Sequence, residues 1–474
     1  METVDSKEKD NSVLIMNWYL KSSEKVHMWL LIMWIILPII MVCYVFIMGT
    51  QGNFITEEEL IKSGLHLGSA NYNVVIKTYY RLFQVVGLLT FVFSVLHLIL
   101  CRKRVFSKNG ILKNRWFLYL LLLFVWAIVS TLLSDDPLRA FSGGNYTHDG
   151  FFSYILYASA FLCASTIRKE KYRLIILRLF CSVVSVLALI MVIQELSRNS
   201  FLDYCFPSFR AVVFNQFNHF GYVLCMGIIA FWGLYLYDKT AGRKMQIAYL
   251  VGFCALVYAL LINDTFGAYL ATVVATPIIF IFYVRSGGII CWKSFVPLVA
   301  FVLISVLSIL NVLPGSANLS KNLTQFGTDV KNVATGSEQA ASAGTGRFTL
   351  WKDTIKKISE RPLFGYGPQG FYGKNAITNN DAPHNEYLQM AGFLGIPALL
   401  FYLGALFSLA FDHWKKIKEL DPLVIAVSGV TVVYLFSAFF GNPFFNTAPF
   451  FWMFLGLTTA TNEKTPPLIS LEDA

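Results

Sequence analysis

Apolar runs close to 20 residues long recur along the chain and alternate with short polar segments. A helix of about 20 residues crosses about 30 Å of hydrocarbon, so the pattern predicts an all-α polytopic membrane protein with about twelve transmembrane helices. An outer-membrane barrel would instead show alternating segments of about 10 residues. The predicted spans are residues 28–48, 82–101, 116–133, 151–167, 174–194, 219–237, 246–262, 266–284, 294–313, 386–411, 422–440 and 447–460.

These spans divide the chain into five parts. Residues 1–27 form a cytoplasmic N-terminal segment, 28–313 hold spans 1–9, 314–384 form a large extracytoplasmic loop between spans 9 and 10, 385–460 hold spans 10–12, and 461–474 form a cytoplasmic tail. The first apolar run is followed by no small-residue cleavage site, so we expect it to remain as an anchor. No internal repeat is visible.

Composition and charge agree with this class and set the orientation. The chain is 56% hydrophobic and 14% charged, whereas soluble domains carry about 25% charged residues. The net charge of +10 could suggest a nucleic-acid partner, but Lys and Arg lie mostly in short connections. With the N-terminus inside, the connections after spans 2, 4, 6, 8 and 10 carry 6, 4, 3, 2 and 3 basic residues, as the positive-inside rule requires. We therefore predict both termini in the cytoplasm, the long loop outside, and no nucleic-acid partner.

Metal and disulfide chemistry find little support in the sequence. The eight cysteines lie mostly inside apolar runs without a C-x-x-C pair, which indicates small core residues. Asp135 and Asp136 could bind a metal ion, although adjacent carboxylates before a proline are more often a solvated turn. No outward connection has the ligand spacing of a metal site. The sequence therefore predicts no metal and no cofactor.

The long outward loop has two different halves. Residues 315–345 are rich in Gly, Ser, Ala, Thr and Asn, which predicts a mobile segment that is either an inert linker or a lid. Helical periodicity resumes at Arg347 and ends at Pro362. This basic amphipathic helix is either an interfacial anchor or a means of holding a lipid diphosphate at headgroup height. Its apolar face consists of Phe348, Trp351, Ile355 and Ile358.

Candidate chemistry begins with His384. A histidine just before a span is often a satisfied interfacial residue, but a side chain with a pKa near 6.5 can also take a proton from a sugar hydroxyl. The outward histidines His148 and His219 are weaker candidates for the same role. His384 follows a proline and has the polar neighbours Asp381, Asn385 and Glu386.

Three arginines are predicted at the outer ends of spans or on the loop: Arg81, Arg210 and Arg347. Each alone could anchor the chain at lipid headgroups. Together they could neutralise a diphosphate through charge-assisted hydrogen bonds.

Several motifs in this order resemble the core signature of the O-antigen ligase superfamily, a family of bacterial membrane glycosyltransferases. Two upstream segments are similar to further family elements: Asp136-Pro137…Gly143…Asp149-Gly150, and Arg210…Asn215-Gln216-Phe217-Asn218. The core motifs are Arg347…Trp351, then Pro362-Leu363-Phe364-Gly365-Tyr366-Gly367, then His384-Asn385-Glu386-Tyr387-Leu388-Gln389 with Gly392 and Gly395-Ile396.

The resemblance implies a GT-C-like enzyme of the bacterial cytoplasmic membrane. Its donor would be a glycan on undecaprenyl diphosphate, and its acceptor a hydroxyl group of a saccharide, protein or lipid at the outer face of the bilayer. It also implies that His384 assists the acceptor and that no metal takes part. Independently of the resemblance, in-line displacement of the diphosphate favours inversion at the anomeric carbon. Ligase and polymerase remain open. The implied substrate and diphosphate-binding residues are Arg347, Arg210, Arg81, Asn385, Asn218 and Trp351.

Two positions depart from the family pattern. Many members have Ser-Arg-Gly at the start of the eighth span, where this chain has Thr265-Phe266-Gly267, so the role of that arginine would pass to Arg81 or Arg210. Val213 replaces a family glycine. The alternative function is a transporter of a small solute or lipid-linked sugar, but transporters usually hold polar groups at mid-membrane and show repeats, and here the mid-span positions are nearly free of charge.

Overall fold

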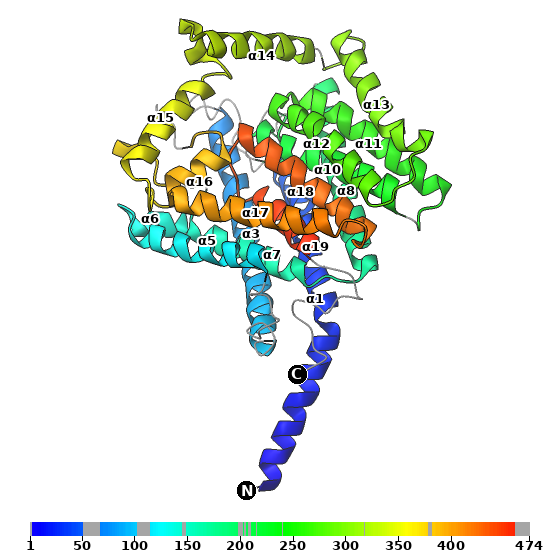
Figure 1. The fold of residues 1–474 in the computed structure, drawn as a ribbon, viewed down its shortest axis with the longest axis vertical. Helices are drawn as coiled ribbons and strands as arrows, with labels where there is room; N and C mark the ends of the chain where they lie inside the picture. Colours follow the sequence, from blue (N-terminus) through cyan, green and yellow to red (C-terminus); the bar gives the residue numbers. More distant parts are fainter. Residues whose placement is uncertain are drawn as a thin grey trace.

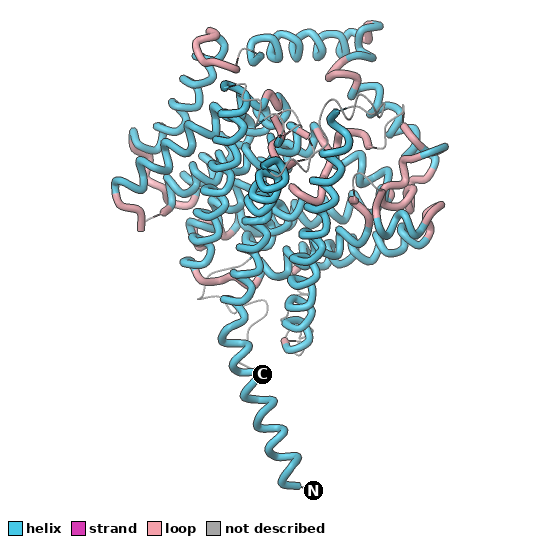
Figure 2. The backbone as a smooth tube through the Cα atoms, turned by 180° about the vertical axis from the view of Figure 1, so that it is seen from behind, coloured by secondary structure: helices cyan, strands magenta, loops and turns pink. Residues whose placement is uncertain are grey.

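The structure is a computed structural model that describes residues 2–50, 67–101, 114–144, 148–197, 202, 205–206, 210–214, 216–238, 240–316, 318–377 and 382–459. Within these ranges the chain is helical and has no strand (Figure 2). The prediction of an all-α polytopic protein is therefore confirmed. Asn215, Asp381, the basic residues of the 102–113 connection and the tail from 461 lie outside the described residues.

Ten described helices are long and apolar enough to cross a membrane. Two shorter apolar helices, α7 (Phe151–Ser165) and α19 (Ala448–Thr459), coincide with the predicted spans 151–167 and 447–460. The ten long helices are α1 (Glu2–Thr50), α3 (Leu67–Leu100), α5 (Arg115–Leu132), α8 (Glu170–Ser197), α10 (Phe217–Tyr237), α11 (Arg243–Asn263), α12 (Phe266–Arg285), α13 (Trp292–Ile309), α17 (Ile396–Lys415) and α18 (Pro422–Ser437).

Helix α10 lies at the centre of the bundle. It is apolar on all sides. In its most apolar 18-residue stretch 89% is buried, whereas the corresponding value for α17 is 22%. A helix that is hydrophobic all round belongs inside a protein, whereas α17 leaves most of its apolar surface for lipid. Pairs distant in sequence lie side by side: α10 with α18, α5 with α17, and α7 with α19 (Figure 1).

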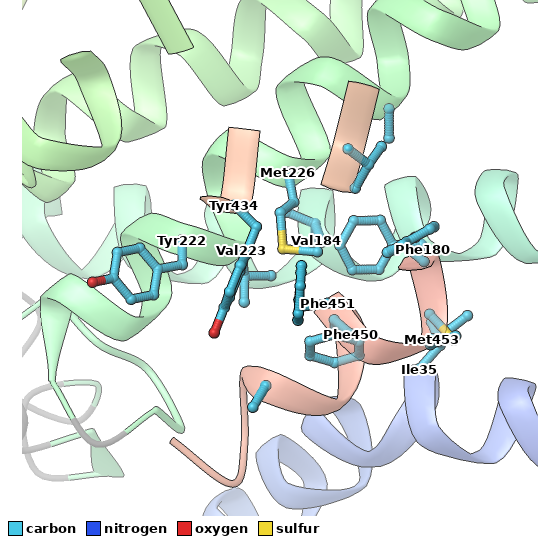
Figure 3. Close-up of a cluster of buried hydrophobic side chains, with 14 of the residues drawn as sticks. Ile35, Phe180, Val184, Tyr222, Val223, Met226, Tyr434, Phe450, Phe451 and Met453 are labelled. Atoms are coloured by element: carbon cyan, nitrogen blue, oxygen red, sulfur yellow. The ribbon is translucent and has the colours of Figure 1, made fainter. Parts of the chain in front are cut away.

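Aromatic side chains from four helices form the centre of the core (Figure 3). Phe180 of α8 meets Phe454 with ring centroids 4.9 Å apart, and Tyr434 of α18 stacks on Phe451 at 4.4 Å. Tyr222 of α10 lies beside Tyr434, with centroids 5.9 Å apart. The carboxyl-terminal helices are thus packed firmly against α10, and this fixes the connection between α18 and α19.

The predicted span 386–411 is two helices and not one, so that prediction is wrong in its bounds. Helix α16 (Glu386–Leu394) ends at Gly395, where φ is +90°, and α17 then begins at Ile396. Positive φ is cheap only for glycine, and a Cβ at this position would also collide with the Leu363 carbonyl. The break separates α16 from the membrane helix and leaves it free to carry the His384 segment.

Residues 315–345, which we predicted to be a mobile linker or lid, are mostly helical in the structure. They contain α14 (Asn318–Thr335) and a short 3₁₀ helix, Glu338–Ser342. Figure 1 shows α14 along the top of the view, between α13 and α15. Its apolar residues are spaced by four and three positions, which defines one helical face. These residues are Leu319, Leu323, Phe326, Val330 and Val333.

Candidate active site

Helix α15 (Arg347–Glu360) begins and ends where the sequence predicts, at Arg347 and before Pro362. Trp351 projects from α15, and its indole Nε1 donates a hydrogen bond to the carbonyl of Pro383 at 3.1 Å. This bond joins the basic helix to the residue that precedes His384. Trp351 therefore holds two parts of the site together, and its predicted part in substrate binding stays a prediction.

The glycine-rich turn after α15 packs on α16. Gly365 and Gly367 have φ values of +64° and +82°, as the predicted tight turns require. The amides of Tyr366 and Gly367 donate to the carbonyls of Gly392 and Phe393 at 3.0 and 2.8 Å. The turn therefore fixes the far end of the helix that begins just after His384.

His384 has a left-handed backbone, with φ of 51°. Such a conformation costs about 1–3 kcal/mol outside glycine and persists only where the surroundings enforce it. Asn385 supplies part of that enforcement: its side chain caps α16 by accepting from the Leu388 amide at 3.0 Å, and its Nδ2 donates to the Phe439 carbonyl at 3.2 Å. Both polar ends of the Asn385 amide are therefore engaged within the protein.

The imidazole of His384 is neutral at physiological pH. Burial lowers the pKa of His384 to about 4, and the nearby Arg347 cation lowers the same pKa further. A neutral imidazole has a free ring nitrogen that accepts a proton. The same arrangement makes His384 a weaker base than an exposed histidine until an anion offsets the charge of Arg347.

Arg347 is a partly buried cation without a matching anion. In the described part of the chain, no Asp or Glu forms an ion pair with it. Burial lowers the pKa of its guanidinium, and an electrostatic interaction with Tyr222 of α10 opposes that effect. Because a buried charge is costly unless it is paired, Arg347 is well suited to bind an anionic ligand.

Arg210 is in a different situation. It also has a left-handed backbone, with φ of 54°, but its guanidinium pairs with Glu195 at 2.6 Å and with Asp264 at 3.6 Å. Asp264 accepts further bonds from Asn318 and Asn322 of α14, at 2.8 and 2.7 Å. The charge of Arg210 is thus balanced, and the group fastens α14 to the bundle.

Of the remaining predicted residues, Arg81 lies inside α3 and Asn218 lies at the start of α10. Arg81 is exposed on α3, and Asn218 is half-buried in the first turn of α10. Their neighbours are more deeply placed. Tyr80 stacks on His148 with centroids 4.0 Å apart, and His219 is buried close enough to interact electrostatically with His384. The structure therefore brings His219 to His384.

The two departures from the family pattern have local explanations. Val213 is not among the described residues with positive φ, so this position does not need glycine. Phe266, in place of the family arginine, has its ring 5.7 Å from Phe326 of α14. An apolar contact with α14 is therefore present at the position where many family members have an arginine.

Asp135 and Asp136 both have partners in the protein. Arg361 donates to both Asp135 oxygens at 2.9 and 3.2 Å, and these bonds lower the pKa of Asp135. Asp136 caps α6 (Pro137–Ser142) and accepts from the Tyr372 hydroxyl at 3.1 Å. These contacts tie α6 to the glycine-rich turn. Among the described residues no group of three His, Cys, Asp or Glu side chains could hold a metal ion.

A buried carboxyl pair lies beneath the His384 segment. Asp149 accepts from the Tyr157 hydroxyl at 3.0 Å, and Glu386 accepts from Tyr434 and Tyr402 at 3.1 and 3.4 Å. Burial raises the pKa of Asp149 to about 8, and Glu386 adds to that effect. Burial likewise raises the pKa of Glu386 to about 7. Neither group needs to be ionised at neutral pH.

The connection between α18 and α19 belongs to the site, and sequence reasoning missed it. Asn442 places its Nδ2 3.4 Å from Nδ1 of His384. Phe444 stacks on His219 with centroids 4.7 Å apart, and Phe445 meets the His148 ring at 6.0 Å. The only sequence signal was a pair of asparagines in a short outward connection.

Several buried polar atoms around this connection have no hydrogen-bond partner in the described structure. Buried polar groups are nearly always satisfied, so this group indicates a surface suited to a polar ligand. The atoms are His148 Nε2, His219 Nδ1, the Tyr222 hydroxyl, Asn442 Oδ1, and both amide atoms of Asn446.

Comparisons with known proteins bear on the same region. A family model described as O-antigen ligase, Wzy_C, matches residues 248–403. A comparison with curated proteins gave no match. The matched region includes Arg347 and His384 but not Arg81 or Arg210. It supports a membrane glycosyltransferase of the general O-antigen ligase or polymerase type, and over residues 248–403 the chain is similar to the O-antigen ligase family.

Proposed function

We propose that this protein transfers a glycan from undecaprenyl diphosphate to an acceptor hydroxyl at the outer face of the bacterial cytoplasmic membrane. One observation carries the proposal: a partly buried guanidinium without an acidic partner in the described chain, Arg347, lies beside a neutral imidazole, His384. The first group suits a diphosphate, and the second suits a hydroxyl that must lose a proton.

The reaction is a displacement at the anomeric carbon of the donor sugar. The acceptor oxygen forms a bond to that carbon while the carbon–oxygen bond to the diphosphate breaks and its electron pair leaves with the diphosphate. His384 takes the proton of the acceptor hydroxyl, and Arg347 balances the charge that develops on the leaving group. Attack opposite the leaving group inverts the anomeric carbon. Preorganised cations and orientation supply most of such rate enhancements, and a positioned base adds about 10²–10⁴-fold.

A diphosphate bound at Arg347 would also improve the base. Its negative charge offsets the cation that, after burial, holds the pKa of His384 near 4. The pKa of the imidazole therefore rises when the donor binds, and His384 becomes a stronger base in the complex than in the free enzyme. Donor binding and proton transfer are coupled through this one pair of residues.

A second cation for the diphosphate would come from Arg81 or Arg210. Arg81 is exposed and makes no ion pair with a described acidic residue. Arg210 would first have to exchange Glu195 and Asp264 for phosphate oxygens. Such an exchange would change the charge beside the hydrogen bonds that Asp264 makes to Asn318 and Asn322 of α14.

The test is glycan transfer by the purified protein in liposomes that contain an undecaprenyl-diphosphate-linked oligosaccharide and a saccharide acceptor. We expect His384→Ala to lower transfer by about 10²–10⁴-fold. Lys356→Ala, which changes an exposed cation of α15, should transfer as the wild type does. Unchanged transfer by His384→Ala would remove His384 as the base. Movement of the lipid-linked sugar or a small solute across the vesicle without formation of a glycosidic bond would favour the transporter alternative.

A further inference from the structure

The side chain of Asn442 lies beside one ring nitrogen of His384. Asn442 lies in the connection between η4 (Ala438–Phe440) and α19, 58 residues from His384 along the chain. Its Nδ2 is 3.4 Å from Nδ1 of His384, while its Oδ1 has no partner in the described structure. The two ends of an amide have almost the same shape, so either end fits at the same place.

The two amide orientations have opposite consequences. If Nδ2 donates to Nδ1 of His384, Nδ1 must carry the lone pair and Nε2 must carry the proton, so Nε2 cannot accept a proton. If Oδ1 accepts from Nδ1–H, the lone pair of the neutral ring is on Nε2. Only the second orientation gives His384 a free nitrogen on the side of the ring opposite to Asn442.

We propose that Asn442 is a positioning residue whose Oδ1 accepts the Nδ1 proton of His384 and so keeps Nε2 as the base; this rests on the proposed function of His384. The orientation gives Oδ1 the partner that it otherwise lacks. It also turns Nδ2 to the place where Oδ1 lies. Asn442 itself takes no proton.

The connection is held firmly enough to serve this purpose. Nδ2 of Asn385, the residue after His384, donates to the Phe439 carbonyl at 3.2 Å. Gly441 lies against the Tyr222 hydroxyl so closely that a Cβ there would collide with it. Phe444 stacks on His219. Asn442 is therefore fixed between contacts to α16 and to α10.

The charged and titratable groups around His384 define what a pH profile would report. Arg347 of α15 lowers the pKa of His384, as burial does. His219 of α10 lies close by, and Tyr222 of the same helix interacts with Arg347. Glu386, on the helix that follows His384, is bonded to Tyr434 and Tyr402. Asn442 carries no charge and does not titrate, and it lies next to the ring, so a charge introduced there acts on His384 directly.

Two substitutions separate positioning from general structural damage. Asn442→Asp keeps an oxygen acceptor for Nδ1–H and adds a negative charge, which should raise the pKa of His384 by about 1–3 units. The pH at which kcat falls on the acidic side should rise by that amount, and transfer should be retained at neutral pH. Asn442→Leu removes the acceptor and should lower kcat about 10–100-fold with KM little changed, since the base loses its orientation.

A second measurement reports on His384 without turnover. Diethyl pyrocarbonate modifies neutral imidazole, so the pH dependence of its reaction with the His384 peptide, followed by mass spectrometry of the full-length protein, gives the pKa directly. A higher midpoint in Asn442→Asp than in the wild type supports the proposal. Equal midpoints, or equal kcat values for Asn442→Leu and wild type, would overturn it. Wild-type transfer by His384→Ala would instead overturn the base role on which the proposal rests.

Discussion

Arg347 and Arg210 are two arginines with the same predicted role and opposite surroundings. Arg210 has two carboxylate partners, Glu195 and Asp264, and its group extends to α14. Arg347 has no acidic partner in the described part of the chain and lies against a histidine and a tyrosine hydroxyl. The comparison shows that two arginines with the same predicted role differ in their local balance of charge. On that difference we base the proposed anion site at Arg347.

Within the comparison of the two arginines, the largest expected effect comes from removing the unbalanced cation. Arg347→Gln should lower kcat/KM for glycan transfer by about 10²–10³-fold, the usual loss for one preorganised group that stabilises a leaving anion. Transfer assays in liposomes measure it, with Lys356→Gln as the control on the same helix. A loss of less than about 3-fold would mean that Arg347 does not contact the diphosphate.

Arg210→Gln should act mainly on stability. It leaves Glu195 and Asp264 without their cation, which costs about 1–3 kcal/mol, and it should lower the melting temperature of the purified protein more than Arg347→Gln does. In the double variant Arg210→Gln with Glu195→Gln, part of the loss should return, because one uncompensated charge is gone. If Arg347→Gln destabilised the protein and Arg210→Gln did not, the comparison would be reversed.

The pH dependence of kcat/KM should also differ between the Arg347 and Arg210 variants. Because His384 must be neutral to act as a base, kcat/KM should fall as the pH drops through its pKa, near 4. Arg347→Gln removes a charge that lowers this pKa, so the acidic limb should move to higher pH, yet stay below 6.5 because burial is the larger cause. Arg210→Gln should leave the limb in place. A wild-type limb at 6.5 would contradict the burial of His384.

The smallest effects concern the tethers. Trp351→Phe removes the hydrogen bond to the Pro383 carbonyl, worth about 1 kcal/mol, and should reduce transfer about 5-fold. Its control is Trp292→Phe, at an exposed position of α13. Asn322→Ala removes a hydrogen bond from α14 to Asp264. It should reduce transfer less than Trp351→Phe does. Equal losses in the Trp351 and Trp292 variants would show that the Pro383 bond does not position the site.

Sequence reasoning succeeded where the signal is local. The all-helical class, the start of α15 at Arg347 and the tight turn at Gly365 follow from runs and periodicity within one segment. The helical face of α14 was also present in the sequence, but the abundance of small polar residues around it favoured a linker. The break at Gly395 was missed because apolar residues continue on both sides of it.

Contacts between residues far apart in the chain could not be predicted from the sequence. The partners of Arg210 come from α8 and from the connection after α11, and Asn442 reaches His384 from 58 residues away. No local pattern says which carboxylate will meet which arginine, because the packing of α8, α10 and α11 against one another decides it. For the same reason Arg81, Arg210 and Arg347 could not be ranked before the structure placed them.

Direct binding of undecaprenyl diphosphate to the protein in nanodiscs tests the central claim, that Arg347 is the guanidinium that receives the diphosphate. Loss of charge-assisted hydrogen bonds worth about 1.5–3 kcal/mol should weaken binding by Arg347→Gln about 10–100-fold, while Lys356→Gln binds as the wild type does. Equal affinity in the wild type and in Arg347→Gln would contradict the account.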